Sequence, residues 1–422
     1  MRQQLLSLTA GGRWACRLES TVQRNLRWFW FDGLFASASD AIVISYLPLF
    51  VLALGATPGQ IGLMNALSSL SAALVLMPGA TLVDRRGQRK GIVVASGGVG
   101  TRLALLFLAL IPLAFAGPAA IAVAVALTVA RSALGNLALP AWIAMTADIV
   151  PLSWRGRYFA SRNMAMEVAK MIMVLLVGVL ITRAGGGDGL VGYQWALGLA
   201  FAVGMLSTYS FASLDEPSLP APEQADVQTA RSSLWRTLRA DTRFLTFCGV
   251  TALWNFSLNI AGPFFNPYLV QELEASEMVV GVLTVIVSLA ALPGQRLFGL
   301  LSDRWGPRRV QLLTGLLIPL LPLAWLLVRS PWHVVPINLG AGFLWAGYNL
   351  ASFNFLLALT PQNRRAHFSA LYQIILLVAL AGGSALGGVL VDALGYGIIF
   401  VLSAIGRFVA ALLFHRLIRQ DP

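Results

Sequence analysis

The chain has 422 residues, of which 57% are hydrophobic and only 11% are charged, and its mean hydropathy is +0.75. Soluble domains usually carry about 25% charged residues, so this composition excludes an ordinary soluble protein and predicts an integral membrane protein. The formal net charge of +12 is typical of nucleic-acid-binding proteins, but the positions of the basic residues, given below, argue against that function.

Catalytic and metal-binding motifs are missing from the sequence. The two cysteines, Cys16 and Cys248, and the three histidines are scattered rather than clustered. The sequence also contains neither a phosphate-binding glycine loop nor a Gly-x-Ser-x-Gly nucleophile motif. We therefore expect no enzyme activity, no metal site and no cofactor.

The N-terminal residues 1–28 are basic and lack the long apolar core of a signal peptide. We predict a cytoplasmic lead-in with amphipathic character. Its arginines are Arg2, Arg13, Arg17, Arg24 and Arg27.

The rest of the chain contains twelve apolar segments, each long enough to cross a bilayer at 1.5 Å per residue. A polar stretch that includes DEPSLPAPEQADVQ divides them into six and six. We predict a first six-helix bundle at 29–213, a cytoplasmic linker at 214–243 and a second bundle at 244–418. The predicted segments are 29–54, 60–83, 91–115, 118–147, 157–182, 192–213, 244–271, 277–301, 309–328, 332–359, 367–391 and 396–418.

The basic residues orient this bundle. Most arginines and lysines fall in the lead-in, the linker, the C-terminal end or alternate loops, whereas the other loops hold only Arg183 and Arg329. Loops rich in lysine and arginine stay in the cytoplasm. We therefore predict a multi-pass protein of the plasma (inner) membrane with both termini in the cytoplasm. The positive charge is then a topology signal and not a nucleic-acid-binding surface.

The two halves repeat each other. Shifting the chain by 219 positions superposes LVDRRGQRK on LSDRWGPRR, and Gly192-Tyr193 recurs as Gly395-Tyr396 at a shorter offset. Each charged loop joins the second and third helices of its half on the cytoplasmic side, where Gly87 and Gly306 permit a tight turn. We interpret these loops as gates; the alternative is that they only anchor the helices at the membrane surface. The gating residues would be Asp84, Arg85, Gly87 and Arg89 in the first copy and Asp303, Arg304, Gly306 and Arg308 in the second.

This doubled motif resembles the signature of the major facilitator superfamily of secondary transporters. GLLSDRWGPRR, from Gly299, fits the family pattern Gly-x-Leu-Ala-Asp-Arg-x-Gly-Arg-Arg/Lys, whereas ATLVDRRGQRK departs from it at Ala80 and Gln88. The resemblance implies an all-α fold of twelve transmembrane helices in two pseudo-symmetric bundles. It also implies alternating access around a cavity lined by the first, fourth, seventh and tenth helices.

Ionisable residues inside apolar segments are costly and therefore mark functional candidates. Asp40 lies near the middle of the first segment, and Arg131 lies near the middle of the fourth, with Gly135 at the spacing common in the family. We hypothesise that protonation of Asp40 releases Arg131 and so couples proton movement to transport. The alternative is a static ion pair. The repeat places the neutral Asn259 opposite Asp40.

Two further acids are weaker proton-coupling candidates. Asp32 is a candidate second site for the transported proton; the alternative is a hydrated residue at the membrane interface. Glu167 lies on the same helical face as Lys170, and the alternative there is that the two charges only neutralise each other. Arg102 and Arg407 fall in helices that are peripheral in the family, which predicts snorkelling or packing.

Amides and aromatic rings in the fourth, seventh and tenth segments suggest contacts with an amphipathic organic substrate; the alternative for each amide is a hydrogen bond between helices. These substrate-binding candidates are Asn136, Trp142, Asn255, Asn259, Trp345, Tyr348, Asn349 and Asn354.

We therefore expect a monomeric secondary transporter in the lipid bilayer, coupled to protons and exporting a small organic molecule. Import of a metabolite by a proton symporter or a facilitator remains open, as does a non-transporting role as an assembly factor or receptor.

Overall fold

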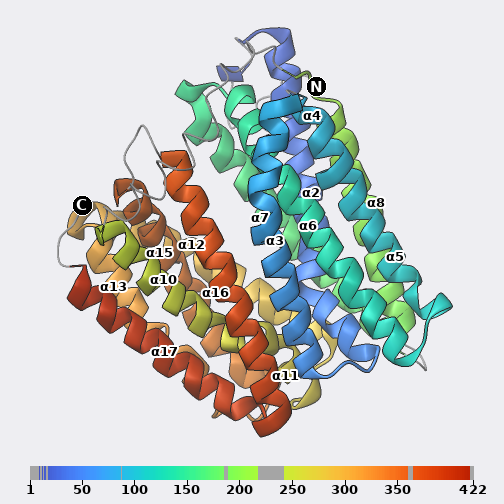
Figure 1. Cartoon of the computed structure of the whole chain (residues 1–422), viewed down its shortest axis with the longest axis vertical. Helices are drawn as coiled ribbons and strands as arrows, with labels where there is room; N and C mark the ends of the chain where they lie inside the picture. The colour runs from blue at the N-terminus through green and yellow to red at the C-terminus, as the bar shows by residue number, and fades with distance from the viewer. Residues whose placement is uncertain are drawn as a thin grey trace. The chain divides into compact units, whose positions relative to one another are not determined.

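The computed structural model describes residues 18–86, 88–184, 189–216, 242–359 and 365–418, together with residues 9, 12, 14 and 15. Within these ranges, the side chains of residues 84–86, 353–354, 356–359 and 365–370 are not described. Long α-helices dominate the described residues, and no strand is present among them (Figure 1).

The first six predicted segments all form helices. The third is continuous from α4 through a π-helical stretch into α5, a local widening that helices use to accommodate an extra residue. The helices are α2 (Ser20–Ala53), α3 (Pro58–Arg86), α4 (Arg89–Ile92) with α5 (Thr101–Ala114), α6 (Gly117–Ile149), α7 (Arg155–Ala184) and α8 (Leu190–Ala212).

The second six segments also form helices, two of them in pieces. The seventh segment consists of α10 and α11, joined by a short 3₁₀ turn, and the ninth consists of α13 and α14. The helices are α10 (Thr242–Ala261), α11 (Phe265–Gln271), α12 (Glu277–Trp305), α13 (Pro307–Leu317), α14 (Leu320–Trp325), α15 (Val334–Leu359), α16 (Arg365–Leu394) and α17 (Tyr396–Leu417).

Ten spans among the described residues are long and apolar enough to cross a membrane. They correspond to every predicted segment except the ninth and the tenth. The ninth segment is interrupted at Pro319, because proline lacks the N–H group that a continuous helix needs. The tenth segment forms one helix of 26 residues, α15. The all-helical membrane fold that the sequence predicts is thus confirmed.

The start of the first helix differs from the expectation. Helix α2 begins at Ser20 rather than at residue 29, so the end of the predicted lead-in is helical. Asn25 explains part of this extension, because its amide both donates to the carbonyl oxygen of Asp215 and accepts from the N–H of Asp215, each at 2.9 Å. Leu26 is fully buried on the same helical turn.

By internal contacts the chain divides into two compact units. The first unit comprises Met1–Ala56 and Leu74–Pro222, and the second comprises Thr57–Ala73 and Glu223–Pro422. The first turns of α3 therefore group with the second unit. There, the carboxylate of Asp392 on α16 accepts the N–H of Gly59 at 2.9 Å and the hydroxyl of Thr57 at 3.0 Å, which caps the N-terminus of α3.

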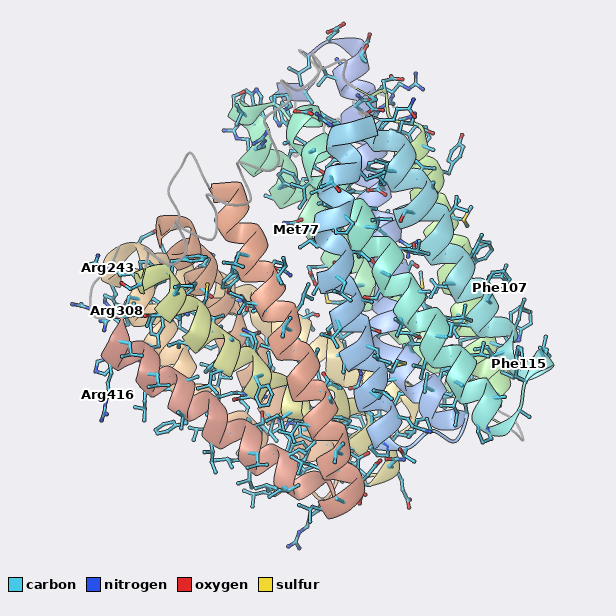
Figure 2. The ribbon with its side chains drawn as sticks, viewed as in Figure 1. Met77, Phe107, Phe115, Arg243, Arg308 and Arg416 are labelled. Atoms are coloured by element: carbon cyan, nitrogen blue, oxygen red, sulfur yellow. The ribbon has the colours of Figure 1, made fainter. Side chains whose placement is uncertain are left out.

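The outer surfaces of the helices are apolar. Leu74, Leu113 and Leu327 expose 75%, 76% and 80% of their area, values that suit contact with lipid tails. In Figure 2, Phe107 and Phe115 project outward from the first unit, while Arg243, Arg308 and Arg416 lie together at one end of the second. This grouping of arginines is the pattern that the topology prediction requires.

Helices α10 and α16 of the second unit approach closely through glycines. A Cβ atom on Gly383 would overlap the carbonyl oxygen of Phe256, and one on Gly387 would overlap that of Ile260. The glycine-rich run of the sequence thus serves close backbone packing, which is how membrane helices replace a hydrophobic driving force.

We predict that Gly383→Ala lowers the melting temperature of the purified protein, by an amount equivalent to about 1–3 kcal/mol, because the methyl group forces α10 and α16 apart. The matched control is Gly249→Ala on α10, where an added Cβ meets nothing within 4 Å. Removing a helical glycine there stabilises by up to about 1 kcal/mol. Equal melting temperatures for the two variants would contradict this account of the helix contact.

Candidate functional site

Asp40 of α2 lies between two arginines in the first unit. Its Oδ1 atom accepts a hydrogen bond from Nη2 of Arg131 on α6 at 3.0 Å and one from Nη1 of Arg102 on α5 at 3.2 Å. The Asp40 side chain is nevertheless 43% exposed. The predicted contact between Asp40 and Arg131 therefore exists, and a second guanidinium joins it.

The two arginines differ in how tightly they are held. Arg102 has only 7% of its side chain exposed, and it also donates to the hydroxyl of Ser39 at 3.1 Å. Gly204 on α8 makes room for it, because a Cβ there would overlap the Arg102 side chain. Arg131 is 21% exposed and has no such second partner among the described residues. Arg102 is thus a fixed partner of Asp40, and Arg131 is the freer one.

Sequence reasoning missed Arg102. It predicted snorkelling or packing, whereas the guanidinium is buried and paired. The available signal was depth, because Arg102 lies well inside its span, as Asp40 does. The sequence does not show which way the side chain turns around the helix.

Asp32 forms a second buried ion pair on α2. Its Oδ1 accepts the hydroxyl proton of Ser207 at 2.7 Å, and its Oδ2 lies 3.5 Å from Nη2 of Arg162 on α7. Arg162 also donates to the carbonyl oxygen of Phe29 at 3.0 Å and lies over the Phe29 ring, 4.2 Å from its centroid. Side-chain exposure is 9% for Asp32 and 6% for Arg162, so this pair is more enclosed than the one at Asp40.

The remaining candidates of the first unit have local partners. Glu167 accepts from Lys170 at 2.7 Å, three residues along α7, and both side chains are about 40% exposed. The amide of Asn136 donates to the carbonyl oxygen of Ser132 within α6. Trp142 packs against Phe29 and lies 5.9 Å from the Arg162 guanidinium, so it belongs to the Asp32 surroundings.

In the second unit the predicted substrate-binding residues differ in burial and in their partners. Tyr348 is buried and stacks on Trp254 with ring centroids 4.5 Å apart, and Trp345 packs edge-on against both rings. Asn349, the next residue on α15, is exposed. Asn255 donates to Thr251 within its own helix, and Asn259 is half-buried. The side chain of Asn354 lies outside the described part of the chain.

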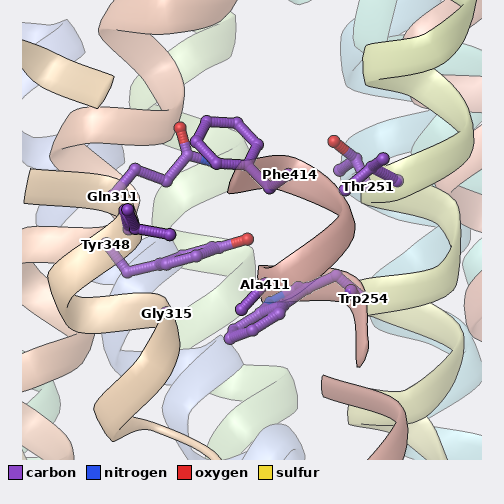
Figure 3. Close-up of a pocket in the computed structure, with 10 residues that line it drawn as sticks. Thr251, Trp254, Gln311, Gly315, Tyr348, Ala411 and Phe414 are labelled. Atoms are coloured by element: carbon purple, nitrogen blue, oxygen red, sulfur yellow. The ribbon is translucent and has the colours of Figure 1, made fainter. Parts of the chain in front are cut away.

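Tyr348 lines a pocket inside the second unit, between α10, α13, α15 and α17 (Figure 3). The side chains of Thr251, Trp254 and Gln311 surround the Tyr348 hydroxyl, and Gly315 leaves space beside the rings. Trp254 and Gln311 were absent from the predicted substrate-binding set, because spacing alone does not reveal which helix faces line a pocket.

The repeated charged loops are only partly described. Asp84 and Arg85 end α3 with side chains outside the description, and Gly87 itself is not described. Arg89 donates to Asp148 at 2.6 Å, and its backbone N–H donates to Glu216 at 2.9 Å. This acid–base cluster connects the start of the third span to the ends of the fourth and sixth.

The second copy of the loop shows the expected turn. Gly306 has a φ of +82°, a conformation that favours glycine, and it separates α12 from α13. Asp303 and Arg304 are exposed. Arg308 donates to the carbonyl oxygens of Ile418 and His415, so it caps the C-terminus of α17.

Two relatives match most of this chain. The multidrug resistance protein MdtG of Serratia proteamaculans is 24% identical over 332 residues, covering 74% of each chain. The enterobactin exporter EntS of Salmonella paratyphi A is 25% identical, covering 80% of this chain and 77% of its own.

Solved structures show the same fold. A mutant of the nucleoside transporter NupG is similar with a TM-score of 0.71 and 14% identity, covering 93% of this chain and 100% of its own. The D-xylose-proton symporter has a TM-score of 0.71 and 15% identity, covering 94% and 98%. The family model of the Major Facilitator Superfamily matches residues 29–258 and 247–422. This chain is therefore a member of the major facilitator superfamily, a multi-pass membrane transporter and not an enzyme.

Proposed function

We propose that this transporter exports a small organic molecule in exchange for protons. It would act as a monomer in the plasma (inner) membrane, with both termini in the cytoplasm. The observation that carries the proposal is Asp40, an acid inside a membrane span that is bound by two guanidinium groups and is still 43% exposed. An accessible acid at that depth is expensive to maintain, and such residues commonly belong to proton pathways.

The proposed coupling step follows from the difference between Arg102, which is buried and held by Ser39, and Arg131, which is more exposed. With Asp40 ionised, the cluster of one carboxylate and two guanidiniums has a formal charge of +1. Protonation of Asp40 raises this charge to +2, so the two cations repel and the freer Arg131 leaves. Arg102 stays in place through Ser39. Movement of Arg131 on α6 is the local event that would bias the alternating-access equilibrium.

We propose that Asp32 is a second residue that binds the transported proton. It lies two helical turns from Asp40 on α2, about 12 Å along the axis at 1.5 Å per residue. Among the described residues its one ion-pair partner, Arg162, lies at the long distance of 3.5 Å, and the Arg162 guanidinium also contacts the rings of Phe29 and Trp142. Glu167, neutralised by Lys170 nearby, is an accessory candidate.

Export of an amphipathic compound is supported by two observations. The relatives MdtG and EntS carry names that describe drug resistance and export. The candidate substrate contacts also combine amides with large rings. The fold similarity to NupG and to the xylose symporter favours the second candidate, proton-driven import of a metabolite.

We predict that Asp40→Asn abolishes uphill transport and leaves substrate exchange intact, because the amide cannot take up and release a proton. The first measurement is a growth panel of toxic compounds and metabolites in bacteria that make equal amounts of wild type or variant. Wild-type protection that disappears in the variant identifies an exported compound. That compound is then tested in vesicles for coupled proton release.

The matched control is Glu19→Gln, which neutralises an exposed acid at the start of α2. It should protect like the wild type. Protection by Asp40→Asn equal to that of the wild type would refute proton coupling at this residue. New sensitivity or new nutrient use with the wild type would instead establish import.

We predict that substitutions of the two arginine partners of Asp40 have different effects on protein stability and on transport. Arg102→Gln lowers the melting temperature by about 5 °C or more, because Arg102 is buried and tied to Ser39 and Asp40. Arg131→Gln changes it by less than half as much and still abolishes coupled transport. Melting curves and vesicle transport of both purified variants make the comparison. Equal losses of stability would mean that Arg131 is as static as Arg102.

A further inference from the structure

Arg407 on α17 of the second unit is a buried cation. Its residue is 2% exposed, its Nη2 donates to the carbonyl oxygen of Leu258 at 3.4 Å, and its Nε has no hydrogen-bond partner. Within the described part of the chain, no carboxylate lies within ion-pair distance of it. Arg102, Arg131 and Arg162 of the first unit each contact one.

The repeat aligns Arg407 with Gly204, the residue beside which the Arg102 side chain lies in the first unit. The 219-residue offset aligns Ser39 with Leu258 and Asp40 with Asn259, and the offset of the Gly-Tyr pair aligns Gly204 with Arg407. In the first unit, Arg102 reaches across Gly204 to Ser39 and Asp40. In the second unit, Arg407 is at the position that aligns with Gly204, and its guanidinium donates to the carbonyl oxygen of Leu258. Both units thus bring a guanidinium to the first helix of the repeat, but among the described residues only the first supplies an acid there.

The pocket of Figure 3 begins one helical turn from Arg407. Ala410 and Ala411 line it from α17, and Trp254, one turn from Leu258, lines it from α10. The Trp254 Nε1–H group is buried and has no hydrogen-bond partner. Arg407, one turn before the pocket-lining Ala410 and Ala411 on α17, holds a second unpartnered buried donor, its Nε–H group. Leaving such donors unpaired is costly, so a bound acceptor is favoured.

The other polar groups of the pocket suit an acceptor as well. The Tyr348 hydroxyl points into the space, and Gln311 hydrogen-bonds to it through its side chain. Gln311 Oε1 is a buried acceptor without a partner. Because Gln311 donates its NH₂ group to the Tyr348 oxygen, the single O–H proton of Tyr348 stays available for an acceptor in the pocket.

The size of the space limits the ligand. A Cβ atom added to Gly315 would lie 3.6 Å from the Tyr348 ring, 3.8 Å from Ala411 and 3.9 Å from the Trp254 ring. These are ordinary contact distances, so the gap beside Gly315 takes a methyl group and nothing larger before its walls must move. A polyatomic organic anion would have to move the stacked rings.

We propose that the second unit binds a chloride-sized monovalent anion between Arg407 and the Trp254–Tyr348 pocket. The anion supplies the negative charge that Asp40 supplies in the first unit, and the donors of Arg407, Trp254 and Tyr348 hold it. It is a bound structural ion and not the transported molecule, so the proposal is independent of substrate and direction.

The test is the melting temperature of the purified full-length protein. Chloride is varied from zero to about 100 mM, with gluconate replacing it at constant ionic strength. We expect a saturable rise of about 5 °C, because a ligand that binds only the folded state stabilises it in proportion to the logarithm of its concentration above Kd. A flat curve, or a linear rise without saturation, would overturn the proposal.

Two variants locate the ion. Arg407→Gln removes the cation, and Gly315→Ala fills the space with a methyl group that fits, so both should lose the chloride response. Arg309→Gln, which neutralises an exposed arginine of the same unit, and Gly249→Ala should retain it. If Arg407→Gln does not fold, the wild-type titration and Gly315→Ala still decide. A full chloride response in Gly315→Ala would place the ion elsewhere and contradict the site proposed here.

Discussion

The pairing of charges inside an apolar medium is the constraint on which this structure depends. An unpaired ion in a bilayer costs several kcal/mol, so an embedded acid must be met by a cation, and for Asp40 and Asp32 that cation comes from another helix. Asp40 therefore ties α2 to α5 and α6, and Asp32 ties α2 to α7 and α8 through Arg162 and Ser207. One helix carries both acids, and its position in the first unit is set by four neighbours that contact them.

The same constraint gives the two halves of the repeat different characters. The first unit places a charged cluster inside its bundle, where Asp40 contacts two arginines. The second unit has Asn259 at the corresponding position and packs Trp254, Tyr348 and Trp345 nearby. A shared scaffold thus carries a cluster of one carboxylate and two guanidiniums in one half and stacked aromatic rings in the other. Fold alone leaves the transported molecule open, because function resides in such side chains.

Residues of the candidate site could be predicted from the sequence where their position in the middle of an apolar segment was enough to identify them. Asp40 and Arg131 are conspicuous because they lie in the middle of long apolar segments, and the structure brings them into contact. The repetition of the charged loop likewise predicted the turn at Gly306, where the backbone needs a positive φ. Rotation about a helix axis was not predictable. Tyr348 and Asn349 are neighbours on α15, yet one is buried in a pocket and the other is exposed.

The sequence by itself determined the membrane environment, the helical fold, the two-fold repeat and the identity of the embedded charges, because hydropathy and residue spacing act along the chain. Tertiary structure decided which charges meet. Arg102 becomes a partner of Asp40 only because Gly204 of a distant helix leaves room for its side chain, and Arg162 reaches Asp32 only because α7 packs against α2. Such contacts depend on how helices turn and how closely they approach, and these are properties of the packed bundle rather than of any one segment.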